Sequence, residues 1–316
     1  MNFSGLIHNF GPLTITGLAQ GAIIALFALG YTLVYGVLRL INFAHSEVFL
    51  LGTYACLILW SFFGLDQNSP TPTGFSVVGL ILLGLVAAIV ISGLTALFVE
   101  LIAYRPLRRR NAPPLAFLIT AIGASLAISE TVGVVTKRNV RGVPPLIVQK
   151  DLFVLGNMHV TNLQVLIIVL ALVSMFVLDR FINRSRLGRG IRAVAQNPDS
   201  AALMGVNKGR VISLVFVLGG LMAGIAAVMY DLKIGVTRFD AGFLLGIEAF
   251  TAAVMGGIGN LRGALLGGIL LGVLQNYAAG LFGTEWLHAV AFVLLVLILL
   301  VRPTGLLGES LGRARA

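Results

Sequence analysis

The amino-acid sequence predicts an all-α integral membrane protein, a polytopic helical bundle with about eight to ten transmembrane helices. Of its 316 residues, 58% are hydrophobic and only 11% are charged, whereas soluble globular chains run near 25% charged. One globule of this size has too little interior to bury so much apolar surface. Long near-neutral runs also recur along the chain, and runs of about eighteen residues or more identify lipid as their solvent.

The apolar stretches follow one another at 12–38, 42–63, 75–101, 115–135, 161–182, 211–232, 243–259, 262–282 and 286–301. A helix needs about 20 residues to cross the hydrocarbon layer, and most of these stretches are long enough. The stretches 243–259 and 286–301 are marginal, and the first is rich in Gly and Ala, so it is expected to span, to re-enter or to be broken. No polar stretch is long enough for a second domain, so residues 1–316 are expected to form one transmembrane domain.

The net charge of +10 is concentrated in two loops. One follows the third stretch and carries Arg105, Arg108, Arg109 and Arg110, and the other follows the fifth stretch and carries Arg180, Arg184, Arg186, Arg189, Arg192, Lys208 and Arg210. Because Lys and Arg in short loops are retained on the cytoplasmic side, both loops and the C-terminus are expected there, with the N-terminus outside. The charge therefore indicates topology and a subunit-facing surface, and no nucleic acid is expected to bind. The basic loop after the fourth stretch, at 137–150, falls on the outer side, against this rule.

Glycines four residues apart predict close helix packing, because small residues let helices approach each other in lipid. The pairs are Gly17 with Gly21, Gly220 with Gly224, Gly263 with Gly267, and Gly268 with Gly272. The glycine-rich run 254–263 makes poor continuous helix and predicts a break. Such a break is either a plain cytoplasmic turn or part of the lining of a translocation pathway, formed by Gly256, Gly257, Gly259 and Asn260.

Polar residues also open the second stretch, where Asn42, His45, Ser46 and Glu47 lie close together. In one interpretation they start a helix, with Asn42 or Ser46 as its cap and Glu47 near the positive end of the dipole. In the other they line the translocation pathway or a gate, because ionisable groups inside a membrane are expensive. Glu130 and Glu248 lie within other stretches, and the sequence pairs them with no partner.

The loop at about 183–210 contains a short helix with a complete set of end signals. Asn197 is a candidate cap, Pro198 fits the first helical position, Asp199 complements the dipole, and Gly205 fits the left-handed position after the end. The predicted helix, 198–204, presents an apolar tip of Ala201, Ala202, Leu203 and Met204. It either lies on the lipid surface or docks to a cytosolic subunit, and docking is favoured because the helix is very short and its arginines precede it.

An enzyme is not predicted. The chain has no Gly-x-x-x-x-Gly-Lys-Ser/Thr loop to hold ATP phosphates. His8, His45, His159 and His288 show no metal-ligand spacing, so no metal site is expected, and no Ser/His/Asp arrangement can be placed on one side. The single cysteine, Cys56, excludes an internal disulfide framework.

Five stretches resemble permease subunits of the branched-chain amino acid ABC importers. They are RAVAQNPDSAALMGVN at 192–207, GYTLVYGVLRLINFAH at 30–45, AFTAAVMGGIGN at 249–260, VRPTGLLG at 301–308 and AYRPLR at 103–108. Together they cover nearly the full length. One position departs from the family pattern, because Ser46 stands where the family usually has Gly between His and Glu.

The resemblance implies a multi-pass permease of a bacterial inner membrane, half of a transmembrane pair in which a heterodimer is favoured. Its partners would be two cytosolic subunits that bind ATP and Mg²⁺, and a soluble binding protein that delivers substrate; the permease itself would bind no cofactor. The ATPase would contact Arg189, Arg192, Asn197, Pro198, Asp199, Ala201, Ala202, Leu203, Met204 and Gly205. Branched-chain or other aliphatic amino acids are the expected substrates. Urea or short amides are the alternative within the family, and a transporter driven by an ion gradient is the alternative outside it.

Overall fold

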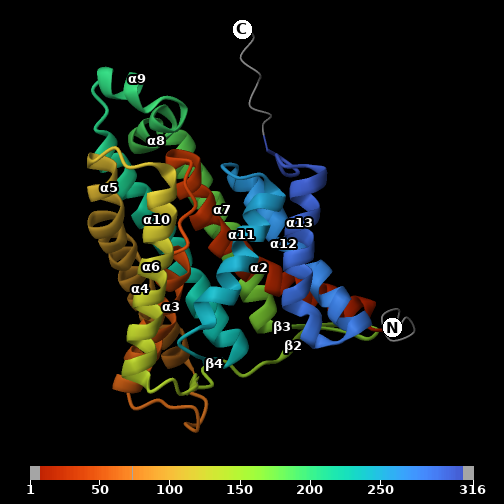
Figure 1. Cartoon of the computed structure of the whole chain (residues 1–316). Helices are drawn as coiled ribbons and strands as arrows, with labels where there is room; N and C mark the ends of the chain where they lie inside the picture. The colour runs from red at the N-terminus through yellow and green to blue at the C-terminus, as the bar shows by residue number, and fades with distance from the viewer. Residues whose placement is uncertain (1–7, 73, 309–316) are drawn as a thin grey trace.

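The computed structural model describes residues 8–72 and 74–308, which form a bundle of helices (Figure 1). The helices are α2 (Phe10–Leu38), α3 (His45–Phe62), α4 (Phe75–Val99), α5 (Arg105–Arg109), α6 (Pro114–Thr136), α7 (Asn162–Arg184), α8 (Arg186–Gln196), α9 (Pro198–Leu203), α10 (Lys208–Ile234), α11 (Ala241–Gly256), α12 (Leu261–Phe282) and α13 (Leu287–Val301). A π-helical turn, η1 (Glu100–Tyr104), joins α4 to α5, and a 3-10 turn, η2 (Thr284–Trp286), precedes α13. The strands in this part of the chain pair antiparallel, β1 (Arg141–Gly142) with β4 (Val236–Thr237) and β2 (Asp151–Leu155) with β3 (Met158–Thr161).

Within the described ranges, eight helical segments are long and apolar enough to cross a membrane. They correspond to eight of the apolar stretches of the sequence, so the predicted polytopic helical fold is confirmed. The remaining stretch forms α11, a shorter apolar helix of 16 residues. This helix is continuous from Ala241 to Gly256, and the break predicted within 254–263 follows it at 257–260. Non-helical backbone lies on either side of α11, at 235–240, which includes β4, and at 257–260.

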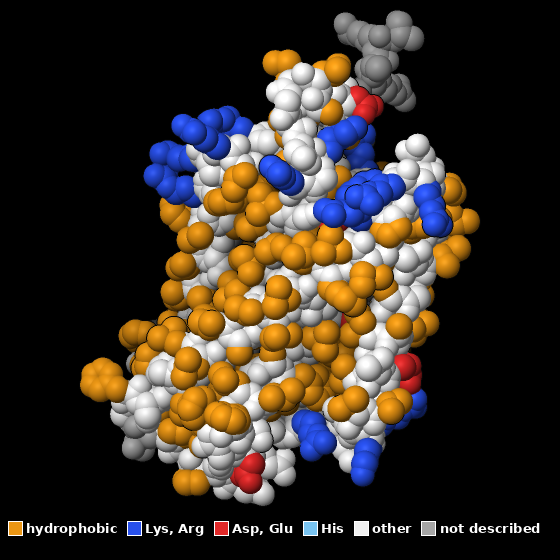
Figure 2. All heavy atoms as spheres, turned by 90° about the vertical axis from the view of Figure 1, so that its left-hand side faces the viewer, with side chains coloured by type: hydrophobic (Ala, Val, Ile, Leu, Met, Phe, Trp, Pro, Cys, Tyr) orange, Lys and Arg blue, Asp and Glu red, His pale blue; other side chains and the backbone are white. Residues whose placement is uncertain are grey.

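The two ends of the bundle differ in charge. Figure 1 places α5, α8, α9 and the end of α13 at one end, called here the α9 end, and β4 with the β2–β3 pair at the other, called the strand end. Lys and Arg side chains gather at the α9 end, beyond a broad hydrophobic belt (Figure 2). The two basic loops of the sequence therefore share one end, as predicted. The loop at 137–150 lies at the strand end, so its departure from the charge rule persists.

Helix α2 runs through the centre of the bundle, and its side chains are buried almost continuously from Gly17 to Val34. Glycines bring its neighbours to backbone contact. A Cβ atom built on Gly21 would lie 2.6 Å from the carbonyl oxygen of Gly268 in α12, and one on Gly220 would lie 2.6 Å from that of Ser92 in α4. The predicted packing role of the glycine pairs is confirmed: Gly17, Gly21, Gly268 and Gly272 join α2 to α12, Gly220 and Gly224 join α10 to α4, and Gly263 and Gly267 join α12 to α11.

Helix α3 begins inside the bundle and not at its surface. Its first residue, His45, is 1% exposed and faces Gly30 and Gly219, which lie well inside α2 and α10. The connection from Leu38 to His45 is not helical and leads from the α9 end into the interior. This start places several polar side chains of the second stretch in the middle of the membrane-spanning part.

Candidate functional site

Helix α9 is capped as the sequence predicts. The side-chain oxygen of Asn197 accepts hydrogen bonds from the backbone N–H groups of Asp199 and Ser200, both at 3.0 Å. Pro198 occupies the first helical position, and Gly205 adopts a φ of 84°, the left-handed conformation that ends the helix. The helix ends at Leu203, one residue earlier than predicted. Two close hydrogen bonds at the start make this short helix a defined structure and not a flexible loop.

The tip of α9 is apolar and protrudes at the far end of the molecule (Figure 1). Leu203 is 89% exposed and Met204 is 85% exposed. Ala202 is exposed as well, but Ala201 is buried under the helix, so its assignment to the tip is wrong: it anchors α9 to its own loop. Two large apolar side chains this exposed on a rigid helix are typical of a binding surface.

Basic residues around α9 divide into free and engaged ones. Arg189 is exposed on α8. Arg192, by contrast, donates from Nη1 to the backbone oxygens of Ile182 and Asn183 at 3.0 and 3.1 Å, which ties α8 to the end of α7. Arg192 therefore has a structural attachment that the sequence did not indicate, while Arg189 is available to an acidic partner.

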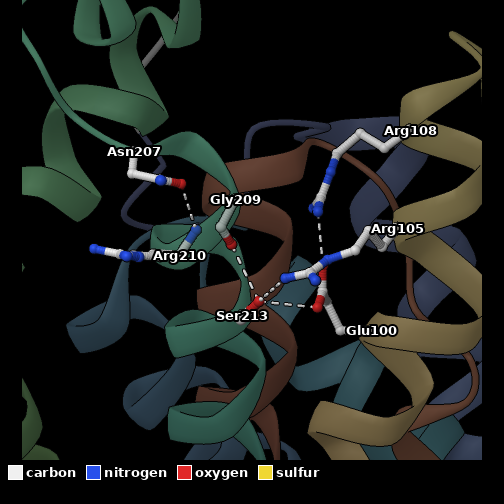
Figure 3. A network of polar contacts seen from close by, with 7 residues as sticks. All are labelled: Glu100, Arg105, Arg108, Asn207, Gly209, Arg210 and Ser213. Carbon is white, nitrogen blue, oxygen red and sulfur yellow. Dashed lines mark hydrogen bonds and ion pairs between the residues drawn. The ribbon is translucent and has the colours of Figure 1, made fainter.

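A polar network connects the start of α10, just after α9, to the end of α4 (Figure 3). Its centre is Glu100, the first residue of η1, whose side chain is completely buried. Arg108 donates from Nη2 to Glu100 Oε1 at 2.6 Å, and the Arg105 Nε atom lies 3.7 Å from the same oxygen. The Ser213 hydroxyl donates to Glu100 Oε2 at 2.9 Å. A buried carboxylate with two cations and a hydroxyl holds these elements in one geometry.

The region of this network extends along the chain to α9. Asn207, four residues after Leu203, accepts a hydrogen bond from the Arg210 N–H at 3.0 Å and so caps α10. Ser213 lies on the next turn of α10. The path from α9 through the start of α10 to η1 is therefore continuous. π-Helical turns are rare and are often found at functional sites.

Glu100 is not among the residues that the sequence pattern indicated, and Arg105 and Arg108 were expected only as topology markers. The sequence does contain one sign of this ion pair. A carboxylate ends an apolar stretch, and arginines follow it five and eight residues later. Its third partner, Ser213, is 113 residues away, so no local pattern could have indicated it.

At the start of α3, the residues Asn42, His45, Ser46 and Glu47 lie together and are all buried. A helix does start here, with Glu47 in its first turn, but neither the Asn42 nor the Ser46 side chain caps it, so the expected cap is wrong. The Asn42 side-chain oxygen accepts instead from the Tyr104 hydroxyl at 3.0 Å. Glu47 Oε1 accepts from the hydroxyls of Ser46 and Ser125, at 3.2 and 3.0 Å.

The second predicted lining segment, with Gly256, Gly257, Gly259 and Asn260, lies elsewhere. It forms a turn between α11 and α12 beside the end of α2, where Gly259 faces Gly36. The Asn260 side-chain oxygen caps α12 at Arg262 and Gly263, and its amide donates to Leu307 at 2.9 Å. The segment therefore forms a turn between two helices. The structure does not bring it together with Glu47.

The two carboxylates that the sequence left unpaired have partners. Glu248 Oε1 accepts from the Gln275 amide at 3.0 Å and lies 2.8 Å from His288 Nδ1. Glu130 forms an exposed ion pair with Arg138 at the strand end.

A protein-family model described as "Branched-chain amino acid transport system / permease component" matches residues 13–299. The chain belongs to this family. The permease is 41% identical to the high-affinity branched-chain amino acid transport system permease protein BraD of Pseudomonas aeruginosa, over 96% of this chain and 97% of the relative. It is 38% identical to LivH of Escherichia coli K12, over 93% and 94% of the two chains. It is also 26% identical to a probable LivH of Methanocaldococcus jannaschii, over 92% and 91%.

Proposed function

We propose that this permease is a transmembrane subunit of an ATP-driven importer that carries branched-chain or other aliphatic amino acids across a bacterial inner membrane. The observation that carries the proposal is α9, a capped helix with a bare apolar tip at the basic end of a family permease. A transporter that works alone has no need of such a tip. The names of the relatives support the substrate class.

The proposed assembly has this permease paired with a second one, as a heterodimer. Two ATP-binding subunits, which hold ATP and Mg²⁺, cover the α9 end, and a soluble binding protein delivers substrate to the strand end. The gathering of Lys and Arg at the α9 end supports a cytoplasmic position for that end, and for the C-terminus, because such residues are retained inside.

In the proposed mechanism, Leu203 and Met204 sit in a groove on the ATPase. Closure of the ATPase dimer then moves α9 together with the flanking helices α7 and α10. The hydrogen bond from Ser213 to Glu100 passes this movement on to η1 and α4. Access to the interior would thereby alternate between the two ends of the bundle.

The test is coupled transport by the complete importer in proteoliposomes. The double variant Leu203→Ser and Met204→Ser should lose stimulation of ATP hydrolysis by loaded binding protein, and uptake should fall about tenfold or more, because apolar anchors dominate docking energy. Leu187→Ser is the matched control, since Leu187 is also an exposed apolar residue of this loop. Unchanged coupling in the double variant would refute the proposal. Uptake that continues without nucleotide and stops with an ionophore would support a gradient-driven transporter instead.

A further inference from the structure

A cavity of 680 Å³ lies between α3 and α6 at the strand end. Its walls include Leu51, Tyr54 and Ile58 from α3, and Val132, Val135 and Thr136 from α6. Its rim carries the side chains of Asp66, Gln67 and Asn68 from the loop after α3, and that of Arg141 from the loop after α6. A cavity with an apolar wall and a polar entrance suits a small amphiphilic molecule.

Glu47 lies beyond the inner end of this cavity. Leu51, Tyr54 and Ile58 repeat at three- and four-residue spacing, so they share one face of α3, and Glu47 is one turn further inward on that face. On α6, Ser125 is two turns inward from Val132 in the same way. The hydrogen bond from Ser125 to Glu47, 3.0 Å long, therefore closes the gap between the two helices above the cavity.

The carboxylate of Glu47 is incompletely satisfied. The residue is 1% exposed, and its Oε2 atom has no hydrogen-bond partner. None of the ion pairs found within the described ranges includes Glu47, in contrast to Glu100. A buried carboxylate without a cation is strongly disfavoured. Its environment lacks a positively charged donor, and a bound ligand could supply one.

Within the described residues, helix α6 has few neighbouring elements. It packs mainly against α3 and η1, and only one stripe of its side chains is buried, including Ala121, Ser125 and Gly133. One hydroxyl–carboxylate hydrogen bond holds its middle to Glu47. A small outward movement of α6 would extend the cavity to the carboxylate.

We propose that the α3–α6 cavity is the entry site for the amino acid, and that Glu47 Oε2 accepts hydrogen bonds from its ammonium group. The apolar wall takes the aliphatic side chain. The ligand class is thus a primary ammonium group on an aliphatic chain. This inference rests on the proposed function for its substrate, but its readout, the rate of thiol modification, depends neither on ATP hydrolysis nor on docking by α9.

The first experiment asks whether the cavity is open to water. In a Cys56→Ser background, Leu51→Cys places a thiol in the cavity wall, and Val169→Cys places one on the exposed apolar face of α7 as a matched control. The complete importer in nanodiscs is treated with a thiosulfonate reagent that carries a trimethylammonium group. Faster modification of Leu51→Cys is expected. Equal, slow modification of both would show a lipid-filled crevice and overturn the proposal.

The second experiment identifies the recognised group by protection of the Leu51→Cys thiol. Leucine and 3-methylbutylamine share the ammonium group, and 4-methylpentanoate has only the carboxylate. The first two should slow modification about tenfold, because a hydrogen bond between charged groups is worth that much or more. Protection should vanish in Glu47→Gln and persist in Glu130→Gln, which makes the same change at an exposed carboxylate of α6. Protection by 4-methylpentanoate, or protection by leucine that survives Glu47→Gln, would refute the assignment.

These results are separable from the proposed function. Protection that depends on Glu47 would stand even if the α9 variants left ATP hydrolysis coupled. Conversely, an importer uncoupled by the α9 variants could still show no protection, which would remove only the entry site.

Discussion

Glycines, which lack a Cβ atom, set the spacing between the central helices. A Cβ atom on Gly21 would lie 2.6 Å from the Gly268 oxygen and 2.7 Å from the Ile269 Cα atom, and both are backbone atoms that cannot rotate away. In lipid, where packing and not water exclusion holds helices together, such contacts carry much of the association. Gly21 is therefore a structural requirement of the α2–α12 pair.

Gly21→Ala should lower the unfolding temperature of the purified permease in detergent, because α2 and α12 must move apart. Overpacking of this kind costs about 1–3 kcal/mol. Gly79→Ala is the control: a Cβ there meets nothing within 4 Å, and alanine favours helix over glycine by up to about 1 kcal/mol. A Gly21 variant as stable as the Gly79 variant would contradict the packing argument.

Residue-level patterns predicted some parts of the site and not others. Asn197, Pro198 and Gly205 act on neighbouring backbone atoms, so their roles could be inferred from sequence alone. Asn42 and Glu47 resemble a helix start equally well, but their partners Tyr104 and Ser125 are 62 and 78 residues away. Hydrogen bonds between residues so far apart in sequence depend on how the helices pack, and a local sequence pattern does not predict that packing.

At the scale of elements, the apolar stretches predicted the helices because a span must satisfy its backbone hydrogen bonds internally. The depth at which a helix starts was not predictable. The stretch 42–63 gave the right helix, but only the packing of His45 against Gly30 and Gly219 shows that it begins inside. By contrast, the glycine-rich run 254–263 located the break after α11, which lies at 257–260.

The short helix α9 depends on its cap more than a long helix would. Asn197→Ala removes the acceptor for two backbone N–H groups, a loss of about 1 kcal/mol, and hydrogen exchange at Asp199 and Ser200 should accelerate accordingly. Coupled ATP hydrolysis should fall in part, because the tip is still present but is less often ordered. Asn197→Asp keeps the acceptor and should retain slow exchange. Equal exchange in all three proteins would show that the cap does not stabilise α9.

At the scale of the whole molecule, the basic α9 end opposes a strand end that has both Lys and Arg of its own, at 137–150, and acidic residues such as Asp66. The larger group of Lys and Arg, at the α9 end, should decide the orientation of the protein in the membrane. The basic loop at 137–150 favours the opposite orientation, so the orientation depends on which of the two groups of basic residues prevails.

Reporter fusions show on which side of the membrane each end of the bundle lies. Green fluorescent protein fused after the C-terminus should fluoresce, because it folds in the cytoplasm, and alkaline phosphatase at the same position should be inactive. Alkaline phosphatase inserted after Asn68, in the loop at the strand end, should be active. The reverse pattern would mean that the loop at 137–150 governs insertion.

The Ser213 hydroxyl, near the start of α10, has two possible hydrogen-bond acceptors. Its oxygen lies 2.9 Å from Glu100 Oε2 and 3.1 Å from the Gly209 carbonyl oxygen, but a hydroxyl has one proton to donate. At any instant the hydroxyl donates to one acceptor and not to the other. The Arg105 Nη2 atom donates to the Ser213 oxygen at 3.4 Å. Rotation of a single O–H bond therefore attaches this turn either to its own helix or to the neighbouring one. The joint beside α9 can loosen and re-form without separating Glu100 from Arg108.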